Sequence, residues 1–187
     1  MRLVVGISGS SAPIYGVRTL EVLRRLGVET HLILSEGAVR TIALETDYAV
    51  EEVVAMASAV HDSRDLAAGP SSGSFRTDGM IVAPCSMKTL GAIAHSYSAD
   101  LLVRAADVTL KERRKLVLVP RETPLHLGHL RNMVAATEMG AVVLPPMPAF
   151  YHRPTTIDDL VNQTVGKILD QFGLEHGLFR RWSTPEA

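Results

Sequence analysis

The sequence predicts an α/β fold in which helices flank a mainly parallel sheet. Five short apolar runs recur along the chain, and each is unbroken rather than alternating between apolar and polar residues. An unbroken run of strand length is typical of a strand that is covered on both faces. Segments with helical apolar spacing lie between these runs, and strands that alternate with helices are joined by right-handed crossovers into a parallel sheet.

The apolar runs indicate where the strands lie. The strands are expected at residues 3–7, 30–34, 80–83, 116–119 and 141–144. A loop is expected at residues 69–74, where glycine, proline and serine gather. Because the strand and helix pattern resumes after this loop, we place the loop inside one domain that spans residues 1–187.

Two segments carry the apolar spacing of amphipathic helices. Residues 50–57 place valine and alanine at i, i+3, i+4 and i+7, and residues 157–172 repeat this spacing through four turns. Thr156 and Asp159 predict a capping box at the start of the second helix. Gly173 predicts its end, because glycine readily adopts the left-handed conformation that closes a helix.

Composition excludes several classes of protein. The formal net charge is −1, from 19 Lys and Arg against 20 Asp and Glu, which excludes a globally basic nucleic-acid-binding protein. One cysteine excludes a disulfide framework and a multi-thiolate metal site, and it fits a reducing compartment. No apolar run is long enough to span a bilayer, and the N-terminal segment lacks the features of a signal peptide. We therefore expect a cytoplasmic protein without a membrane partner.

Small and hydroxyl residues follow the first strand, and ligands of parallel sheets bind beyond the carboxyl ends of the strands. Residues 6–16 read GISGSSAPIYG. Small residues let the backbone approach a ligand, and free N–H groups at a helix start can hold a phosphate. The segment matches neither the dinucleotide-binding glycine motif nor a P-loop, so an ordinary tight turn is the alternative interpretation.

Hydroxyl groups also follow the second and third strands. Ser35 is a candidate hydroxyl partner for a ligand. Ser86 and Thr89 can cap or line a helix N-terminus, where anions are favoured. Cys85 has two interpretations, a nucleophile or a small buried thiol, and the lack of a histidine nearby in the sequence favours the buried thiol.

Charged residues follow the fourth strand. Arg121 and Glu122 follow residues 116–119 and Pro120, at the end of the strand where a ligand would lie. An arginine there can hold phosphate and a neighbouring carboxylate can transfer protons, although a surface ion pair is the alternative. Arg104 and Lys111 are seven residues apart and share one face of an expected helix.

Aromatic and histidine residues give weaker signals. Phe150, Tyr151 and His152 follow the fifth strand and a proline-rich segment, so this stiff loop either clamps a ligand or covers the core. His126 and His129 lack a nearby third ligand, so no metal site is expected.

Taken together, these segments resemble the flavin prenyltransferases, the UbiX-like proteins formerly described as aromatic-acid decarboxylase subunits. The resemblance spans nearly the whole chain, and residues 104–122 are its most specific part. The matching segments are residues 6–11, 15–16, 45–47, 84–89, 104–114, 116–122 and 150–152.

The resemblance implies a single-domain, three-layer α/β sandwich of flavodoxin-like or Rossmann-like type in a homo-oligomer, expected to be a dodecamer. It implies an enzyme that transfers the dimethylallyl group of dimethylallyl phosphate to N5 and C6 of reduced FMN without a metal. The product, prenylated FMN, would serve a separate UbiD-like decarboxylase. Neither a nucleic acid nor a membrane is an implied partner.

Matched residue by residue, the resemblance also implies the site. The FMN contacts would be Gly9, Ser10, Ser11, Ser35, Ser86, Met87, Lys88, Thr89 and Arg121. The contacts to dimethylallyl phosphate would be Tyr151 and Lys167. The catalytic polar groups would be Ser11, Glu45, Arg104, Lys111 and Glu122.

Three features depart from the resemblance or stay open. Ala12 stands where many relatives have glycine. An alanine adopts fewer backbone conformations than a glycine, so Ala12 restricts the conformation of the loop after the first strand. Lys167 stands where some relatives have arginine. Lysine keeps the positive charge but cannot form the bidentate hydrogen bonds of a guanidinium group. The tail, residues 176–187, either closes over a neighbouring site or is a flexible terminus.

Two other functions stay open. A non-enzymatic FMN-binding protein that delivers the cofactor to a decarboxylase would share the FMN contacts but would not need Glu122. A flavin-dependent peptidyl-cysteine decarboxylase would carry a Pro-x-Ala-Asn-Thr-like segment, and residues 84–89 contain no asparagine, which argues against it. We expect no decarboxylation of an aromatic acid by this chain alone.

Overall fold

One sheet of parallel strands organises residues 1–182, the part of the chain that the structure describes. In this computed structural model the strands are β1 (Arg2–Ile7), β2 (Glu29–Leu34), β3 (Ala59–Asp62), β4 (Gly79–Cys85), β5 (Lys115–Pro120) and β6 (Val142–Val143). They pair in the order β3-β2-β1-β4-β5-β6, which is that of a Rossmann fold. Every pair is parallel, so the α/β prediction is confirmed and the described sheet is wholly parallel.

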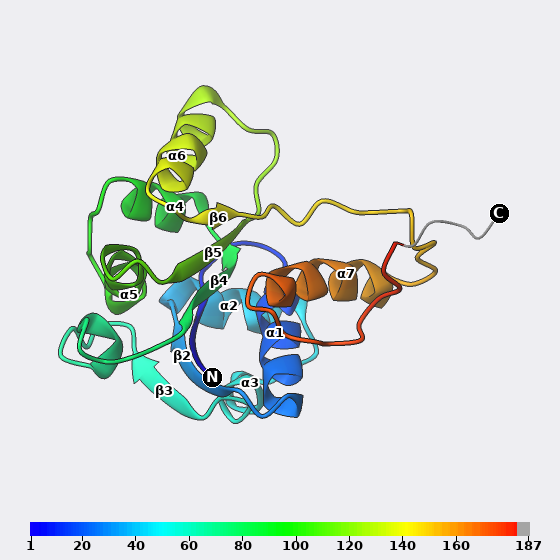
Figure 1. Cartoon of the computed structure of the whole chain (residues 1–187), viewed down its shortest axis with the longest axis horizontal. Coiled ribbons are helices and arrows are strands. Elements are labelled where there is room, and N and C mark those ends of the chain that lie inside the picture. Colours follow the sequence, from blue (N-terminus) through cyan, green and yellow to red (C-terminus); the bar gives the residue numbers. More distant parts are fainter. Residues whose placement is uncertain (183–187) are drawn as a thin grey trace.

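Helices cover both faces of the sheet, as Figure 1 shows. The helices of the first face are α1 (Ile14–Arg25), α2 (Glu36–Glu45), α3 (Val50–Val54) and α7 (Ile157–Asp170). The helices of the second face are α4 (Met87–Ala94), α5 (Leu101–Lys111) and α6 (Leu127–Glu138). The described residues therefore form a three-layer sandwich, as the sequence predicts. Within them, no helix is both long and apolar enough to cross a bilayer.

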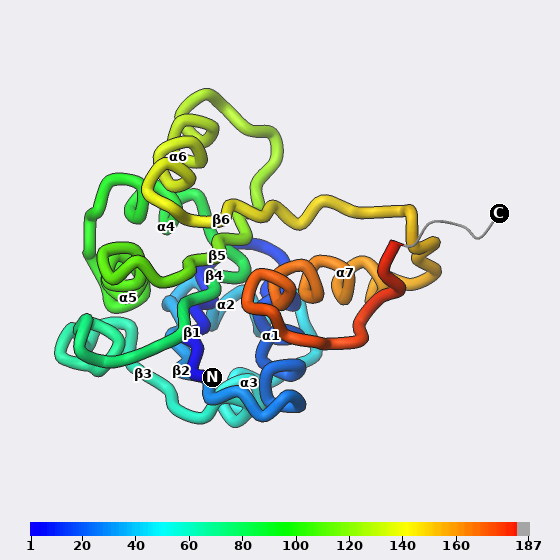
Figure 2. Tube along the Cα trace, viewed as in Figure 1, coloured from blue at the N-terminus to red at the C-terminus, as the bar shows by residue number. Residues whose placement is uncertain are grey.

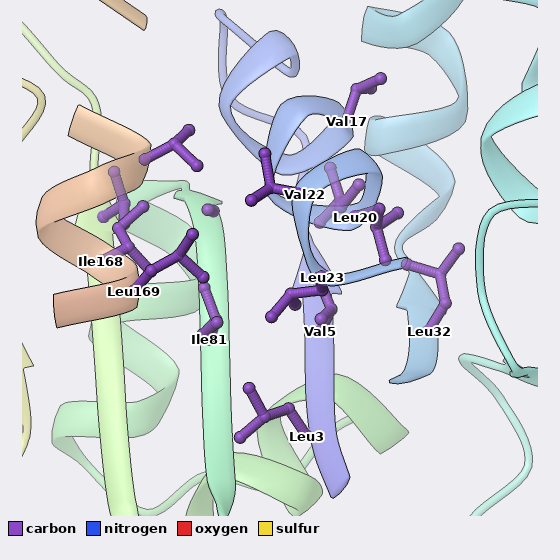
Figure 3. Packing of buried hydrophobic residues seen from close by; sticks show 14 of the residues in the cluster. Leu3, Val5, Val17, Leu20, Val22, Leu23, Leu32, Ile81, Ile168 and Leu169 are labelled. Atoms are coloured by element: carbon purple, nitrogen blue, oxygen red, sulfur yellow. The ribbon is translucent and has the colours of Figure 1, made fainter. Parts of the chain in front are cut away.

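The strand β1 shows why the predicted runs are unbroken. Leu3 and Val5 pack toward α1 and α7, whereas Val4 between them packs toward α4 and α5, and none of the three is more than 2% exposed. Figure 3 shows Val5 beside Leu23 of α1, with Leu3 further along the strand. Each fully buried aliphatic side chain contributes about 1.5–3 kcal/mol, so both faces of the strand stabilise the fold.

Two strands differ from the sequence expectation, and both lie at an edge of the sheet. The edge strand β3 is not predicted, because its residues alternate between half-buried and exposed and include His61 and Asp62. The opposite edge strand β6 has two residues rather than the four of 141–144, and it pairs only with β5. Edge strands are short and partly solvated, so they lack the long apolar run that identifies central strands.

The predicted start of α7 is confirmed, whereas the helix ends at Asp170, two residues before the predicted 172. The Thr156 hydroxyl accepts the Asp159 N–H at 3.1 Å, and the Asp159 carboxylate accepts the Thr156 N–H at 2.9 Å, which completes the capping box. Gly173 has φ +67° and closes the final turns by donating its N–H to the carbonyl of Asp170. The other predicted helix, α3, is shorter than residues 50–57 and ends at Val54.

The segment after α7 turns back along that helix, as Figure 2 shows. The Asp170 carboxylate accepts a hydrogen bond from Arg181 at 2.8 Å and lies 3.3 Å from His176 Nε2. Arg25 of α1 donates to the carbonyl of His176 at 3.1 Å. Of the tail considered above, residues 183–187 lie outside the described residues.

A pair of histidines joins β2 and β3. His31 Nδ1 lies 2.9 Å from His61 Nε2, and His31 Nε2 lies 3.0 Å from a Glu29 oxygen that also accepts from Arg2 at 2.8 Å. His31 is 8% exposed, and the edge of the Phe75 ring packs against it. Burial, and next the charge of the His31 ring, lower the pKa of His61, while Asp65 acts in the opposite direction.

We expect the stability of the protein to fall as the pH is lowered below about 6.5, the ordinary pKa of histidine. Because the pKa of His61 is lower in the folded chain, the unfolded chain binds this proton more readily. The stabilisation from His61 is fully present above about pH 6.5 and is lost as the pH falls from there through the lower pKa that His61 has in the folded chain. The measurement is urea unfolding of the wild type and of His61→Gln at about pH 7.5 and about pH 5.5. Equal losses in both proteins would contradict the assignment.

Candidate functional site

The centre of the sheet forms a crevice between β1 and β4. These strands are neighbours, but the chain leaves β1 for α1 on one face and leaves β4 for α4 on the other. In a doubly wound sheet, ligands bind at such a switch point, beyond the carboxyl ends of the strands. Two segments that carry hydroxyl residues, 8–11 and 86–89, come directly after these strands.

Two glycines let the loop after β1 contact the start of α2. A Cβ on Gly9 would lie 2.8 Å from the Cα of Gly37, and a Cβ on Gly37 would lie 2.9 Å from the Cα of Gly9. Ser35 caps α2 by accepting the Ala38 N–H at 3.1 Å, and its own N–H donates to the carbonyl of Ile7 at 3.0 Å. The start of α2 is therefore held against the end of β1.

The second wall of the crevice is the start of α4. Ser86 is the N-cap, because its hydroxyl oxygen accepts the Thr89 N–H at 3.2 Å and donates to the Thr89 hydroxyl at 3.0 Å. The free N–H groups in the first turn of a helix attract anions. Two helix N-termini, of α2 and α4, thus open toward the same crevice.

A cavity of about 940 Å³ lies beyond these helix starts. Five of the predicted FMN contacts line it: Gly9, Ser35, Ser86, Lys88 and Thr89. The cavity is also lined by Glu36 and Gly37, which follow Ser35 at the end of the second predicted strand. Lining residues that were not identified from the sequence include Arg40, Ser63, Arg64, His95, Tyr97, Asp100 and Val103. The side chain of Met87, also a predicted contact, packs instead against the buried cluster of the second face.

Arg64 is the clearest residue that the sequence analysis missed. It follows β3, the edge strand that has no apolar signature, and it pairs with Asp62 at 3.3 Å. Had β3 been recognised, Ser63 and Arg64 would have been examined as another strand end. Arg40 was missed for a different reason, because it lies one helical turn into α2, where it pairs with Glu36 at 2.8 Å.

A carboxylate holds the loop between β1 and α1. Ser11 Oγ donates to Glu45 Oε2 at 2.9 Å, and the Ala12 N–H donates to the same oxygen at 2.7 Å. Ala12 has φ +66°, a conformation that favours glycine. Ser11 and Glu45, which are 34 residues apart, are thus brought together as predicted catalytic groups.

Arg121 lies at the same edge of the sheet. Its carbonyl accepts the Ser10 hydroxyl at 2.8 Å, and its N–H donates to the carbonyl of Cys85 at 3.3 Å. Burial raises the pKa of Tyr15, while the Thr164 hydroxyl and the positive charge of Arg121 lower it. Arg121 is thus near the first turn of α1. Glu122, the next residue, is exposed and accepts the Thr123 N–H at 3.0 Å.

Tyr151 and Lys167 lie together along α7. The amide nitrogen of Gln163 donates to the Tyr151 hydroxyl at 3.4 Å, and Lys167 is one turn further along the helix. Lys167 Nζ lies 3.6 Å from Asp170. Thr164 connects this part of α7 to Tyr15 at the start of α1.

Arg104 and Lys111 are not brought to this edge within one chain. Lys111 ends α5 four residues before β5 begins, so it lies at the amino-terminal edge of the sheet. A strand of six residues spans about 20 Å, which separates Lys111 from the carboxyl ends. Arg104 lies midway along α5 and donates to the carbonyl of Ser71 at 3.1 Å and to Asp107 at 2.8 Å.

The remaining candidates have structural explanations. Cys85 is fully buried, and burial raises the pKa of its thiol to about 12, so the buried-thiol interpretation is confirmed. His126 caps α6 by accepting the Gly128 N–H at 3.0 Å. Among residues 1–182, no group of three or more His, Cys, Asp or Glu side chains is arranged to hold a metal ion.

Comparisons with known proteins identify the family. A profile described as Flavoprotein matches residues 1–169. The flavin prenyltransferase UbiX of Thauera aromatica is 62% identical over 186 residues, which is 100% of this chain and 96% of the relative. UbiX of Escherichia coli K12 is 61% identical over 184 residues, 97% of both chains. This chain belongs to the UbiX flavin prenyltransferases.

Solved UbiX structures agree with the fold. A dodecameric FMN-dependent UbiX-like decarboxylase from Escherichia coli O157:H7 superposes with a TM-score of 0.97 at 55% identity, covering 98% of this chain and all of that chain. AnUbiX (PadA1) in complex with FMN and dimethylallyl pyrophosphate also superposes at 0.97, with 55% identity and coverage of 99% and 98%. The FMN-dependent cysteine decarboxylase TvaF, at 19% identity and a TM-score of 0.63, shows likeness of fold alone.

The crevice fits the flavin mononucleotide that the UbiX family implies. Gly9 and Gly37 leave backbone exposed where a Cβ would fill the space. The starts of α2 and α4 offer N–H groups to a phosphate. Arg40, Arg64 and Lys88 line the cavity together with Glu36 and Asp100, and Arg40 and Arg64 are paired with Glu36 and Asp62. These donors match the ribityl phosphate chain of FMN, which is anionic and polar.

We expect Gly9→Ala to destabilise the protein by about 1–3 kcal/mol, because the added Cβ meets backbone atoms of Gly37 that cannot move independently. The matched control is Gly91→Ala in α4, whose Cβ would meet only the Asn132 side-chain amide at 3.3 Å. In a helix interior this control is expected to be neutral or stabilising by up to about 1 kcal/mol. Chemical unfolding of both variants measures the difference, and a Gly9→Ala variant as stable as Gly91→Ala would contradict the close approach.

Proposed function

We propose that this chain catalyses the transfer of a dimethylallyl group from dimethylallyl phosphate to N5 and C6 of reduced FMN. The observation that carries the proposal is the convergence of two helix N-termini, Ser11 with Glu45, and Arg121 with Glu122 at one edge of the sheet. The relatives at 61–62% identity are flavin prenyltransferases, and AnUbiX binds both FMN and dimethylallyl pyrophosphate.

The FMN contacts divide between the cavity and the loop after β1. Gly9, Ser35, Ser86, Lys88 and Thr89 would hold the cofactor from the cavity wall. Ser10, Ser11, Met87 and Arg121 complete the proposed contact set, with the backbone N–H of Met87 in the first turn of α4 rather than its side chain. FMN supplies the two atoms that receive the prenyl group.

Charged side chains of this chain have clear tasks in such a transfer. A departing phosphate is stabilised by cations, and we assign this task to Arg121, Lys167 and Lys111. Closure of the new ring at C6 releases a proton, which the exposed carboxylate of Glu122 can accept. The face of Tyr151 can stabilise positive charge on the prenyl group.

We further propose that Arg104 and Lys111 act from a neighbouring copy in a homo-oligomer. Within one chain, Lys111 lies about a strand length from Arg121. The same surface on another copy can approach the crevice without any change in fold. The UbiX-like relative from Escherichia coli O157:H7 is dodecameric, so we propose a dodecamer here.

The proposal extends to the partners and the location. The product, prenylated FMN, would pass to a separate UbiD-like decarboxylase, and the transfer would need no metal. The single cysteine, which is buried and free, supports a location in the cytoplasm.

A carrier without catalytic activity is the second candidate function, and Glu122 distinguishes it. We expect Glu122→Gln to lower the rate of prenylation by about 10²–10⁴-fold, because the proton acceptor is lost while the FMN contacts remain. The measurement is anaerobic incubation with reduced FMN and dimethylallyl phosphate, followed by mass analysis of the flavin. Glu51→Gln, on the exposed surface of α3, is the control. A wild type that binds FMN but adds no C5 unit would refute the enzyme and favour the carrier.

Subunit mixing tests the shared site. We expect Lys111→Ala and Glu122→Gln to be inactive separately, and co-expression of the two chains to restore about a quarter of the wild-type activity. The restored sites would pair an intact Lys111 of one copy with an intact Glu122 of another, which random assembly provides in about a quarter of sites. Mixed oligomers without restored activity would show that one chain supplies both groups.

A further inference from the structure

Ser8 is fully buried at the switch point, and the site described above gives it no role. It is the first residue after β1, inside the segment 6–16 that the sequence analysis singles out. Its N–H and its hydroxyl both donate to the carbonyl of Pro84, at 3.2 Å and 2.9 Å. The same hydroxyl oxygen accepts the N–H of Ser86 at 2.7 Å.

These contacts stand where the regular pairing of β1 with β4 stops. The paired register ends at Gly6 and Val82, and the pairing of β4 with β5 shifts between Val82 and Cys85. Pro84 has no N–H to donate to a neighbouring strand. The carbonyl of Ser8 accepts the Ser10 N–H at 2.8 Å, so the Ser8 hydroxyl oxygen takes the place of a backbone acceptor for the Ser86 N–H and joins the carboxyl ends of the two strands.

The Ser8 hydroxyl also reaches the cap of α4. Its acceptor contact fixes the backbone of Ser86, and Ser86 in turn caps the helix through Thr89. The direction of the first turn of α4 sets where its free N–H groups point, and Ser86, Lys88 and Thr89 of this turn line the cavity. The buried Ser8 hydroxyl is thus connected by two hydrogen bonds to a helix start that lines the cavity.

We propose that Ser8 is a positioning residue, which holds the N-terminus of α4 in the orientation that binds FMN by fixing the Ser86 amide. The inference rests on the proposed function, since FMN binding is its readout. The role needs a group that donates and accepts at once, because Pro84 offers a carbonyl and Ser86 an N–H. Threonine can supply both, whereas alanine supplies neither and leaves the Ser86 N–H without its partner.

The test compares FMN dissociation constants of the wild type, Ser8→Ala and Ser8→Thr by flavin fluorescence titration. We expect Ser8→Ala to bind FMN about 10-fold more weakly or worse, and Ser8→Thr to recover to within about threefold of the wild type. The matched control is Thr109→Val in α5, which removes another buried hydroxyl, one that donates to the carbonyl of Ala105 at 2.7 Å. It is expected to lose thermal stability but to bind FMN within about twofold of the wild type.

Amide hydrogen exchange of the flavin-free chain adds a second readout that does not depend on FMN. The Ser86 amide should exchange slowly in the wild type and quickly in Ser8→Ala. The inference is overturned if Ser8→Ala binds FMN as tightly as the wild type, if Thr109→Val weakens binding as much, or if the wild-type Ser86 amide exchanges like an exposed amide. A wild type that does not bind FMN would instead overturn the proposed function, and this inference with it.

Discussion

The opposite paths of the chain after β1 and β4 are the constraint on which the candidate site depends. The helices that follow these two neighbouring strands lie on opposite faces of the sheet. Neither helix covers the carboxyl ends of the strands, so a crevice remains between them. The walls of that crevice are then the starts of helices, with their unpaired N–H groups. Small residues at Gly9 and Gly37 let those walls approach each other, and the serine caps fix their direction.

Local charge at this edge differs from the charge of the whole molecule. The chain has a net charge of −1, yet the starts of α2 and α4 and Lys88 line the cavity, and Arg121 lies at the same edge of the sheet. Glu45 stands among them and is used to hold the chain: it accepts the N–H of Ala12, whose left-handed conformation costs an alanine about 1–2 kcal/mol. A hydrogen bond to a carboxylate is strong enough to offset much of that cost, which explains how alanine is accommodated at this position.

One chain contains only part of the proposed site. Tyr151 and Lys167 follow α7, whereas Lys111 faces the opposite edge of the sheet. The helix α6 also exposes Leu127, Leu130 and Val134, an apolar face of the kind that subunit contacts usually cover. Both observations support the proposed oligomer, in which the catalytic groups and the stability of α6 depend on neighbouring copies.

The sequence by itself determined the layers of the fold and the edge of the sheet at which the site lies. Unbroken apolar runs such as residues 3–7 identify central strands because both faces of these strands are buried. Residues that directly follow such strands, for example Gly9 and Glu122, lie at the same edge of a parallel sheet. Tertiary structure alone decided three things: the edge strand β3 with Arg64 after it, the contact of Ser11 with Glu45, and the separation of Lys111 from Arg121. Each depends on distances between segments remote in the chain, and local apolar spacing carries no information about such distances.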